Sequence, residues 1–255
     1  MSDQEQPLIA HLVELRNRLL KSVISVLVLF VSMFYFANDL YLIMVEPLSR
    51  LLPDAQNGQM IATGVVSPFL VPFKMTLVLS VIIAVPYILH QIWGFISPGL
   101  YRHEKKFAIP LLLSSIVLFY LGMMFAYFVV LPLAFGFFTM AGPEGISFMP
   151  DIANILDFIL KIFFAFGIAF EIPVATFLLV LSNVTTAQAL SEKRPYVFLG
   201  CFVVGMLVTP PDVISQTILA LPMYALFEGG VLASRLIKRP ADDEEEENSD
   251  SVSDA

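Results

Sequence analysis

Long apolar stretches with few charged side chains recur six times along the chain. They lie near residues 20–37, 70–96, 107–135, 158–182, 195–211 and 213–232. A helix needs about 20 mostly apolar residues to cross the hydrocarbon core of a bilayer. The pattern therefore predicts an all-α, polytopic membrane protein with six transmembrane helices.

Prolines interrupt the second and third of these stretches. Pro72 and Pro86 fall within the second, and Pro110 and Pro132 fall within the third. Proline removes a backbone donor, but spanning helices tolerate it where neighbouring groups satisfy the freed carbonyls. We expect kinks or early helix ends at these positions.

The last two stretches are short for spanning helices. Their charge-free runs, 195–211 and 213–227, contain 17 and 15 residues, which corresponds to lengths of about 25 and 22 Å. The hydrocarbon core is about 30 Å thick. Either the bilayer thins locally, or flanking residues such as Arg194 and Glu228 reach the interface without thinning. The sequence leaves both alternatives open.

Basic residues lie almost entirely on one side of the predicted spans. Eleven of them flank the spans on that side: Arg16, Arg18, Lys21, Arg102, Lys105, Lys106, Lys193, Arg194, Arg235, Lys238 and Arg239. The loops on the opposite side, 38–68 and 136–157, contain only Arg50. Because cytoplasmic loops retain the excess of Lys and Arg, we expect both termini to be cytoplasmic.

Composition agrees with a membrane protein. Charged residues make up 14% of the chain, compared with about 25% in soluble domains, and the mean hydropathy is +0.82. The net charge of −8 comes from eight acidic residues within 241–255, since the remaining 14 acidic residues balance 14 basic ones. We expect one transmembrane domain over 1–238 and a disordered, acidic cytoplasmic tail over 239–255.

Several classes of protein are disfavoured. Cys201 is the only cysteine, so no intrachain disulfide forms, and clustered Cys and His ligands for zinc are missing. His11, His90 and His103 share no spacing, and the GxxxxGK, G-x-S-x-G and H-E-x-x-H motifs are absent. We expect no enzyme activity, metal, cofactor or nucleic-acid partner. The N-terminus lacks an A-x-A cleavage pattern, so no removed signal peptide is expected either.

Glu171 places a carboxylate 13 residues into the fourth apolar stretch. An ionisable residue within a membrane span is costly and marks a candidate functional site. The alternative is a protonated structural glutamate that is hydrogen-bonded to a neighbouring helix, close to the carbonyl freed by Pro173. Gln216, in the sixth stretch, is a candidate polar partner.

Glu14 and Glu104 are acidic residues on the side that is otherwise basic. Glu14 precedes Arg18 by four positions in an amphipathic segment, so the simple interpretation is an intrahelical ion pair. Glu104 likewise has basic neighbours in LYRHEKK. The other interpretation is a joint acidic site for a cationic ligand.

The chain closely resembles the TatC family, the signal-receptor subunit of the twin-arginine protein translocase. The resemblance lies in HLVELRNRLL, PYILHQIWGFISPGLYRHEKK, LFYLGMMFAYFVVLPLAFGFF and KRPYVFLGCFVVGMLVTPPDVISQTILALPMYALFE. It extends to about Lys238. It implies a cup-shaped receptor of six helices in the bacterial inner membrane, with both termini in the cytoplasm.

The resemblance also implies roles for individual residues. Glu14 and Glu104 match the positions at which the family recognises the paired arginines of signal peptides, and Arg16 and Phe95 belong to the same surface. Five further residues match positions used for structure or for contact with single-span partners: Pro47, Glu171, Thr209, Asp212 and Gln216. Two carboxylates suit two guanidinium groups, because only arginine offers a planar, bidentate fork.

The function implied is that of a receptor and core subunit that binds twin-arginine signal peptides of folded proteins. It implies the partners TatA and TatB, further copies of the receptor, and transport driven by the proton-motive force. Two other functions stay open. In a secondary transporter Glu171 would carry a proton, although the internal symmetry common in such folds is not visible. In a membrane scaffold the charges would be purely structural.

Overall fold

The computed structural model describes residues 5–41, 61–96, 108–140, 151–209 and 213–235. Within these ranges the chain is almost entirely helical, and the extended pairing is one isolated bridge between Ile61 and Asp151. The helices are α1 (Glu5–Phe34), α3 (Ser67–Ile96), α4 (Ala108–Phe125), η4 (Ala126–Val130), α5 (Leu131–Met140), α6 (Ile152–Ala169), α7 (Ile172–Leu181), α8 (Ala187–Glu192), α9 (Arg194–Val208) and α10 (Val213–Ser234). The predicted acidic tail, 239–255, lies outside the described residues.

Five segments are long and apolar enough to cross a membrane, and α9 is a shorter apolar helix of 15 residues. These segments coincide with the six predicted stretches, and the all-α, polytopic fold is confirmed. The first helix differs from the expectation at its start. It begins at Glu5, so the amphipathic segment and the first span form one continuous helix.

The prolines act differently according to their positions. Pro72 and Pro86 lie inside α3, which continues through both of them. Before Pro132 the helix widens into the π-helix η4, where the N–H of Leu131 donates to the carbonyl of Ala126. A proline ring clashes with the carbonyl four residues earlier, and a π-turn relieves such a clash within a continuing helix. The third span therefore runs on into α5.

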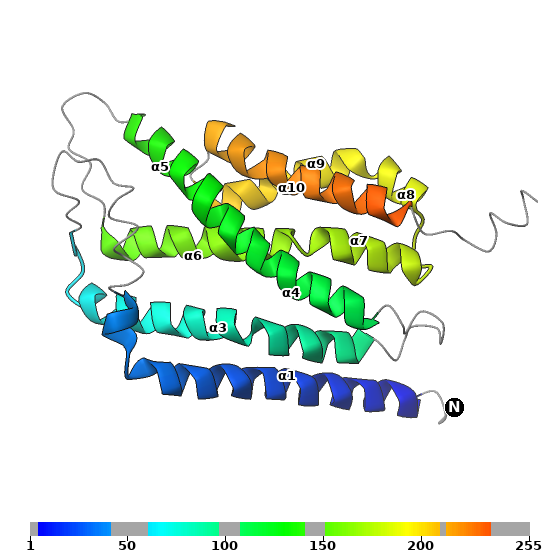
Figure 1. Cartoon of the computed structure of the whole chain (residues 1–255), viewed down its shortest axis with the longest axis horizontal. Helices are drawn as coiled ribbons and strands as arrows, with labels where there is room; N and C mark the ends of the chain where they lie inside the picture. The colour runs from blue at the N-terminus through cyan, green and yellow to red at the C-terminus, as the bar shows by residue number, and fades with distance from the viewer. Residues whose placement is uncertain (1–4, 42–60, 97–107, 141–150, 210–212, 236–255) are drawn as a thin grey trace, which may run out of the picture.

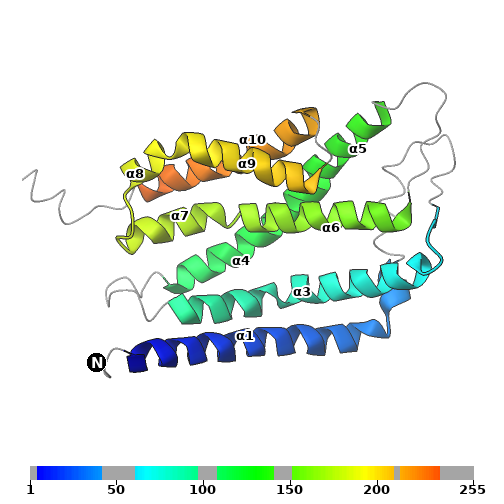
Figure 2. The ribbon, with the colours of Figure 1, turned by 180° about the vertical axis from the view of Figure 1, so that it is seen from behind.

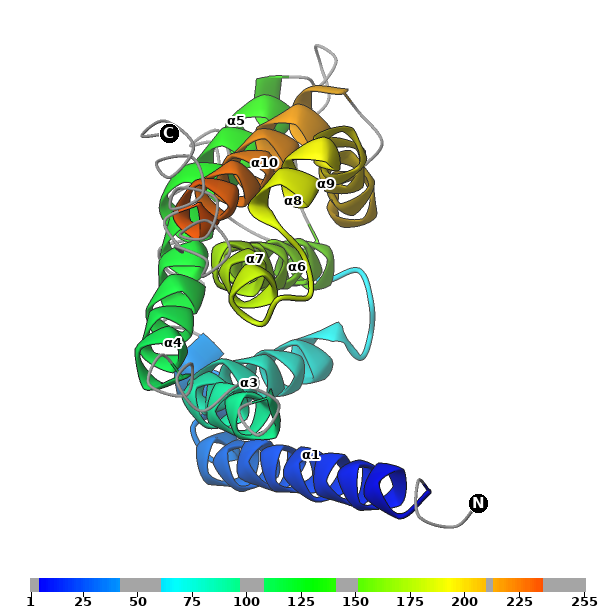
Figure 3. The ribbon, with the colours of Figure 1, turned by 90° about the vertical axis from the view of Figure 1, so that its right-hand side faces the viewer.

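The helices stack in layers. Figure 1 shows α1 beside α3, with α6 and α7 in the next layer and α8, α9 and α10 beyond it. The helix formed by α4, η4 and α5 crosses these layers obliquely, and Figure 2 shows the same order from behind. Seen end-on in Figure 3, this oblique helix follows one side of the bundle and α1 forms an outer edge. The curved outline agrees with the expected cup shape.

The core lies where α6 meets the oblique helix and the α9–α10 pair. Its most buried large side chains are Val130, Leu131, Ile162, Phe166 and Leu219. Two glycines allow close packing of α4 on α6. A Cβ on Gly122 would lie 2.5 Å from the carbonyl oxygen of Phe166, and one on Gly167 would lie 2.7 Å from the ring of Phe119. Small residues let helix backbones approach in this way within membranes.

One end of the bundle is called the basic end here. At this end α1, α4 and α9 begin, whereas α3, α7 and α10 finish (Figure 1). Arg16, Arg18 and Arg194 belong to helices at this end, and Arg235 directly follows α10. Lys74 and the first residues of α6 lie toward the other end, called the opposite end below.

Candidate functional sites

Glu14 and Arg18 form an ion pair near the start of α1. Arg18 Nε and Nη2 donate to Glu14 Oε1 at 2.9 and 2.7 Å. Both side chains are half-buried, with 37% of Glu14 and 26% of Arg18 exposed. The residues are one helical turn apart, so their side chains share a face of the helix. The ion pair expected from the spacing is present.

The end of α3 lies against this face. The ring of His11 stacks on Phe95 with 4.2 Å between ring centroids. The Arg18 guanidinium lies over Gly94, since a Cβ built there would be 2.1 Å from Nη1. Glu14 and Phe95, predicted to belong to one surface, are thus neighbours through His11 and Arg18.

Other members of the predicted surface lie elsewhere. Arg16 is two positions from Glu14, roughly 200° around the helix, and it donates to Asn17 on the exposed side. Leu12 and Leu19 are 64% and 62% exposed, so the leucine stripe of this segment faces away from the bundle. Glu104, the second predicted carboxylate, lies outside the described residues.

Glu171 lies at a break between α6 and α7. The helix is interrupted at Phe170 and Glu171, and Pro173 occupies the first turn of α7, a position that proline favours. The Ser115 hydroxyl of α4 lies close to the Glu171 carboxylate. The Oε1 atom of Glu171 is buried and has no hydrogen-bond partner among the residues that the structure describes.

Gln216 is not close to Glu171. Gly230 of α10 meets α7 near Glu171, because a Cβ on it would lie 2.8 Å from Pro173 Cα. Gln216 precedes Gly230 by 14 positions, which is roughly 21 Å along the helix axis. The expected contact between Gln216 and Glu171 therefore does not form within the chain, and Ser115 takes that place.

Gln216 and Thr209 lie instead near the turn between α9 and α10. Thr209 ends α9, and both its N–H and its hydroxyl donate to the carbonyl of Gly205 at 2.9 Å. A Cβ on Gly205 would lie 3.5 Å from the backbone oxygen of Gln216, so the two helices are in ordinary contact there. Asp212 and Pro47 lie outside the described residues.

Comparison with known proteins decides the family. The profile of the family described as "Sec-independent protein translocase protein (TatC)" matches residues 10–222. The chain belongs to the TatC family. A TatC protein of Azotobacter chroococcum is 58% identical over 237 residues, which cover 93% of this chain and 92% of that protein. The TatC protein of Escherichia coli K12 is 54% identical over 233 residues, which cover 91% of this chain and 90% of that protein.

A solved TatC structure agrees with this assignment. A crystal structure described as that of the twin arginine translocase receptor TatC superposes with a TM-score of 0.79 at 39% identity. The match covers 89% of this chain and 98% of that one. The resemblance found in the sequence is confirmed. As a TatC protein the chain is a multi-pass membrane translocase component, a part of a transport machinery and not an enzyme.

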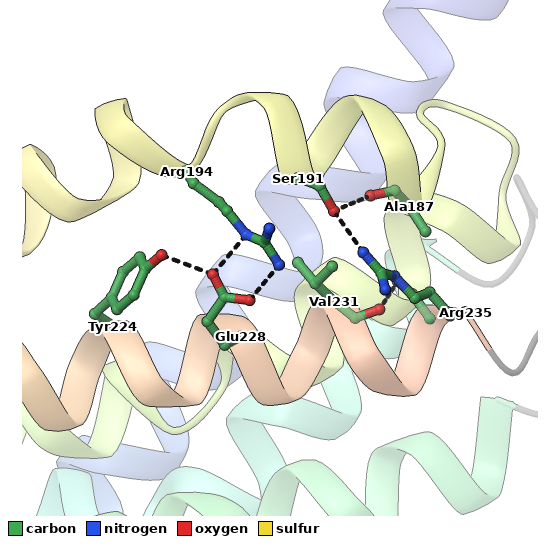
Figure 4. Close-up of polar contacts among 8 residues, drawn as sticks. Ala187, Ser191, Arg194, Tyr224, Glu228, Val231 and Arg235 are labelled. Atoms are coloured by element: carbon green, nitrogen blue, oxygen red, sulfur yellow. Dashed lines mark hydrogen bonds and ion pairs between the residues drawn. The ribbon is translucent and has the colours of Figure 1, made fainter.

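In this TatC chain a polar cluster joins α9 to α10 at the basic end (Figure 4). Arg194 Nε donates to Glu228 Oε1 and Nη2 donates to Oε2, both at 2.7 Å. The Tyr224 hydroxyl also donates to Glu228 Oε1, at 2.7 Å. Arg235 Nη2 donates to Ser191 Oγ of α8 at 3.2 Å. The sequence predicts Arg194 and Glu228 as separate residues that reach the interface, whereas the structure pairs them.

A second link that sequence reasoning missed is at the opposite end. The backbone N–H and hydroxyl of Thr63 donate to Asp151 Oδ2 at 2.8 and 2.6 Å, and Ile152 N–H donates to the carbonyl of Ile61. Asp151 Oδ1 also accepts from the first amides of α6, so one aspartate caps a helix and anchors a distant segment. Nearby, Lys74 of α3 pairs with Asp157 of α6. Among the residues the structure describes, no cluster of three or more His, Cys, Asp or Glu could hold a metal.

Proposed function

We propose that this chain is the receptor and core subunit of a twin-arginine translocase. It binds the twin-arginine signal peptides of folded proteins at the basic end and recruits the single-span subunits TatA and TatB. The solved relative is itself described as a twin arginine translocase receptor. The proposal extends that activity to this chain.

The observation that best supports signal binding is the contact of the Glu14 carboxylate with an arginine side chain. Its carboxylate oxygen Oε1 accepts two hydrogen bonds from a guanidinium at the basic end, so the carboxylate is placed where it can bind arginine side chains. The side chain keeps 37% exposure, so a ligand can reach it. Glu104 supplies the second carboxylate in this proposal, and Phe95 belongs to the same surface. Arg16 is proposed to contact the signal from the exposed side of α1.

A binding experiment tests this function. The full chain in lipid nanodiscs is titrated with a labelled signal peptide that carries Arg-Arg or Lys-Lys. Arg-Arg is expected to bind at least tenfold more tightly, because lysine lacks the planar fork. Changing both Glu14 and Glu104 to Gln should remove most of this preference.

The matched control is Glu192→Gln, an exposed glutamate of α8 at the same end, which should leave the affinity unchanged. Equal binding of Arg-Arg and Lys-Lys by the unchanged chain would contradict the receptor function. That result would favour a structural scaffold.

The mid-membrane carboxylate supports recruitment of a partner helix. Glu171 has one buried oxygen with no hydrogen-bond partner among the described residues, and leaving such a group unsatisfied is costly. The Glu171 side chain as a whole is only half-buried, so a small shift at the α6–α7 break would let a donor side chain on a single-span partner reach this oxygen. We assign Thr209, Gln216 and Asp212 to the partner-facing or structural part of the α9–α10 hairpin, and Pro47 to structure.

Replacing Glu171 should weaken partner association and spare signal binding. Polar contacts between membrane helices average about 0.6 kcal/mol, so Glu171→Ala should lower the affinity for TatB or TatA about threefold. Co-purification and titration of the partner would measure this. Ser114→Ala is the control, because the Ser114 hydroxyl bonds only within its own helix in the described contacts. Unchanged partner affinity would remove the role of Glu171.

Orientation and energy supply complete the proposal. The one-sided distribution of basic residues supports cytoplasmic termini in the bacterial inner membrane. The chain has no nucleotide-binding loop, so the proposed energy source is the proton-motive force. Further copies of the chain are proposed to join the working complex.

A further inference from the structure

The Glu14 carboxylate is occupied before any signal peptide arrives. Arg18 donates to Glu14 Oε1 through both Nε and Nη2, at 2.9 and 2.7 Å. Both bonds end on Oε1, whereas an incoming arginine that binds bidentately needs both oxygens of the carboxylate and so must displace Arg18 from Oε1. The two arginines would therefore compete for one acceptor.

The Arg18 side chain also packs against α3 at a defined position. A Cβ on Gly94 would lie 2.1 Å from Nη1, 3.0 Å from Cζ and 3.3 Å from Nη2 of Arg18. The guanidinium therefore fills the space that the missing side chain of Gly94 leaves. The adjacent His11–Phe95 stack packs α1 onto α3 beside this space. Contacts on two helices thus favour the occupied state.

We infer that Arg18 is an internal competitor, which occupies Glu14 until a signal arginine displaces it. This inference rests on the proposed function, because it concerns the regulation of the same carboxylate. The apparent affinity of the receptor for its signal is then the intrinsic affinity multiplied by the fraction of molecules in which Glu14 is free. Weak, non-signal cations bind less often, because each must first displace Arg18.

The alternative is that Arg18 is a positioning residue, which orients Glu14 and stays in place when the signal binds. The two roles predict changes of opposite sign. Removal of a competitor tightens signal binding, whereas removal of a positioning residue weakens it.

The test uses the full chain in lipid nanodiscs and labelled Arg-Arg and Lys-Lys signal peptides. Arg18→Gln should tighten the binding of both peptides by about two- to fivefold, the range for release of a surface ion pair. Both affinities should change by the same factor, since both peptides compete with the same internal arginine. The ratio of the two affinities should therefore stay constant.

Two variants separate occupancy from simple charge. Lys21→Gln removes one positive charge from the exposed surface of the same helix and should change the affinity less than Arg18→Gln does. Gly94→Ala keeps the charge of Arg18 but fills its place, so it should also tighten binding. Thermal unfolding in the same nanodiscs shows whether each variant is folded.

The outcomes are distinct from those of the proposed function. If Arg18→Gln weakens binding, or changes it no more than Lys21→Gln does, the competitor role is wrong. If Gly94→Ala does not tighten binding, the proposed role of Gly94 is wrong. A failure of the receptor function appears elsewhere, as equal binding of Arg-Arg and Lys-Lys by the unchanged chain.

Discussion

Asp151 links two backbone segments at the opposite end, the one around Thr63 and the start of α6. It accepts from Thr63, from the amide of Ala153 and from the amide of Asn154. These hydrogen bonds, led by that of the Thr63 hydroxyl, lower the pKa of Asp151 from 3.8 to about 2. The charged carboxylate is therefore the form that the folded chain favours.

This link should respond to acid in a defined window. Because the folded-state pKa is lower than the unfolded one, the stabilisation is complete above pH 3.8 and is lost as the pH falls to about 2. The protection of the Thr63 and Ile152 amides from hydrogen exchange, relative to the intrinsic rate at each pH, should fall as the pH falls through this window. Asp151→Asn can still cap the helix but does not titrate there, so it should remove the pH dependence.

Asp39→Asn is the control for this prediction, since it changes an exposed aspartate that follows the end of α1 by five residues. It should leave the acid response of Thr63 and Ile152 in place. An acid response that persists in Asp151→Asn would assign the effect to another group.

Polar contacts were predictable from the sequence only where they are local. Glu14 and Arg18 are four positions apart, so helical periodicity alone places them together. Arg194 and Glu228 are 34 positions apart, and their pairing depends on how α9 packs on α10. Charge and hydropathy along the chain contain no signal for that packing. The contact of Ser115 with Glu171 was missed for the same reason.

At the scale of helices, the crossing of α4 and α6 depends on two glycines. A Cβ on Gly122 would lie 2.5 Å from a backbone oxygen of α6 and 2.9 Å from the ring of Phe170. Backbone cannot move aside as a flexible side chain can. The crossing therefore has no room for even a methyl group.

Gly122→Ala should destabilise the folded chain by about 1–3 kcal/mol, the usual cost of overpacking. Thermal unfolding in detergent or nanodiscs measures the change. Gly200→Ala is the matched control, because a Cβ there meets nothing within 4 Å. Alanine has a higher helix propensity than glycine, so the control should be neutral or slightly stabilising. Equal effects at the two positions would show that the crossing is not tightly packed.

Helix positions were predictable to a greater extent than helix interruptions. Apolar stretches of sufficient length predicted the spans, because every residue in a span must tolerate lipid. Pro173 was a visible signal for a disturbance near Glu171, yet proline does not end every helix. The second span continues through Pro72 and Pro86, and neighbouring packing decides which outcome occurs.

At the scale of the whole molecule, burial is distributed unevenly among the spans. The most apolar window of α1 is 6% buried, whereas those of α3, α6–α7 and α10 are each 39% buried. Its main packing partner in the described structure is α3. The membrane-spanning core is formed by the later helices, and α1 is added at its edge (Figure 3).

This placement of α1 separates two kinds of constraint on one helix. On the outward face, Leu27, Val28 and Val31 are 50–71% exposed. Fluid acyl chains adapt to any contour, so this face is selected for its solubility in oil and not for its shape. On the inward face, Arg18 and Ser22 must fit a rigid neighbour. A library that randomises the outward positions among aliphatic residues would leave the receptor intact. The same randomisation at the inward positions would detach the helix from its neighbour.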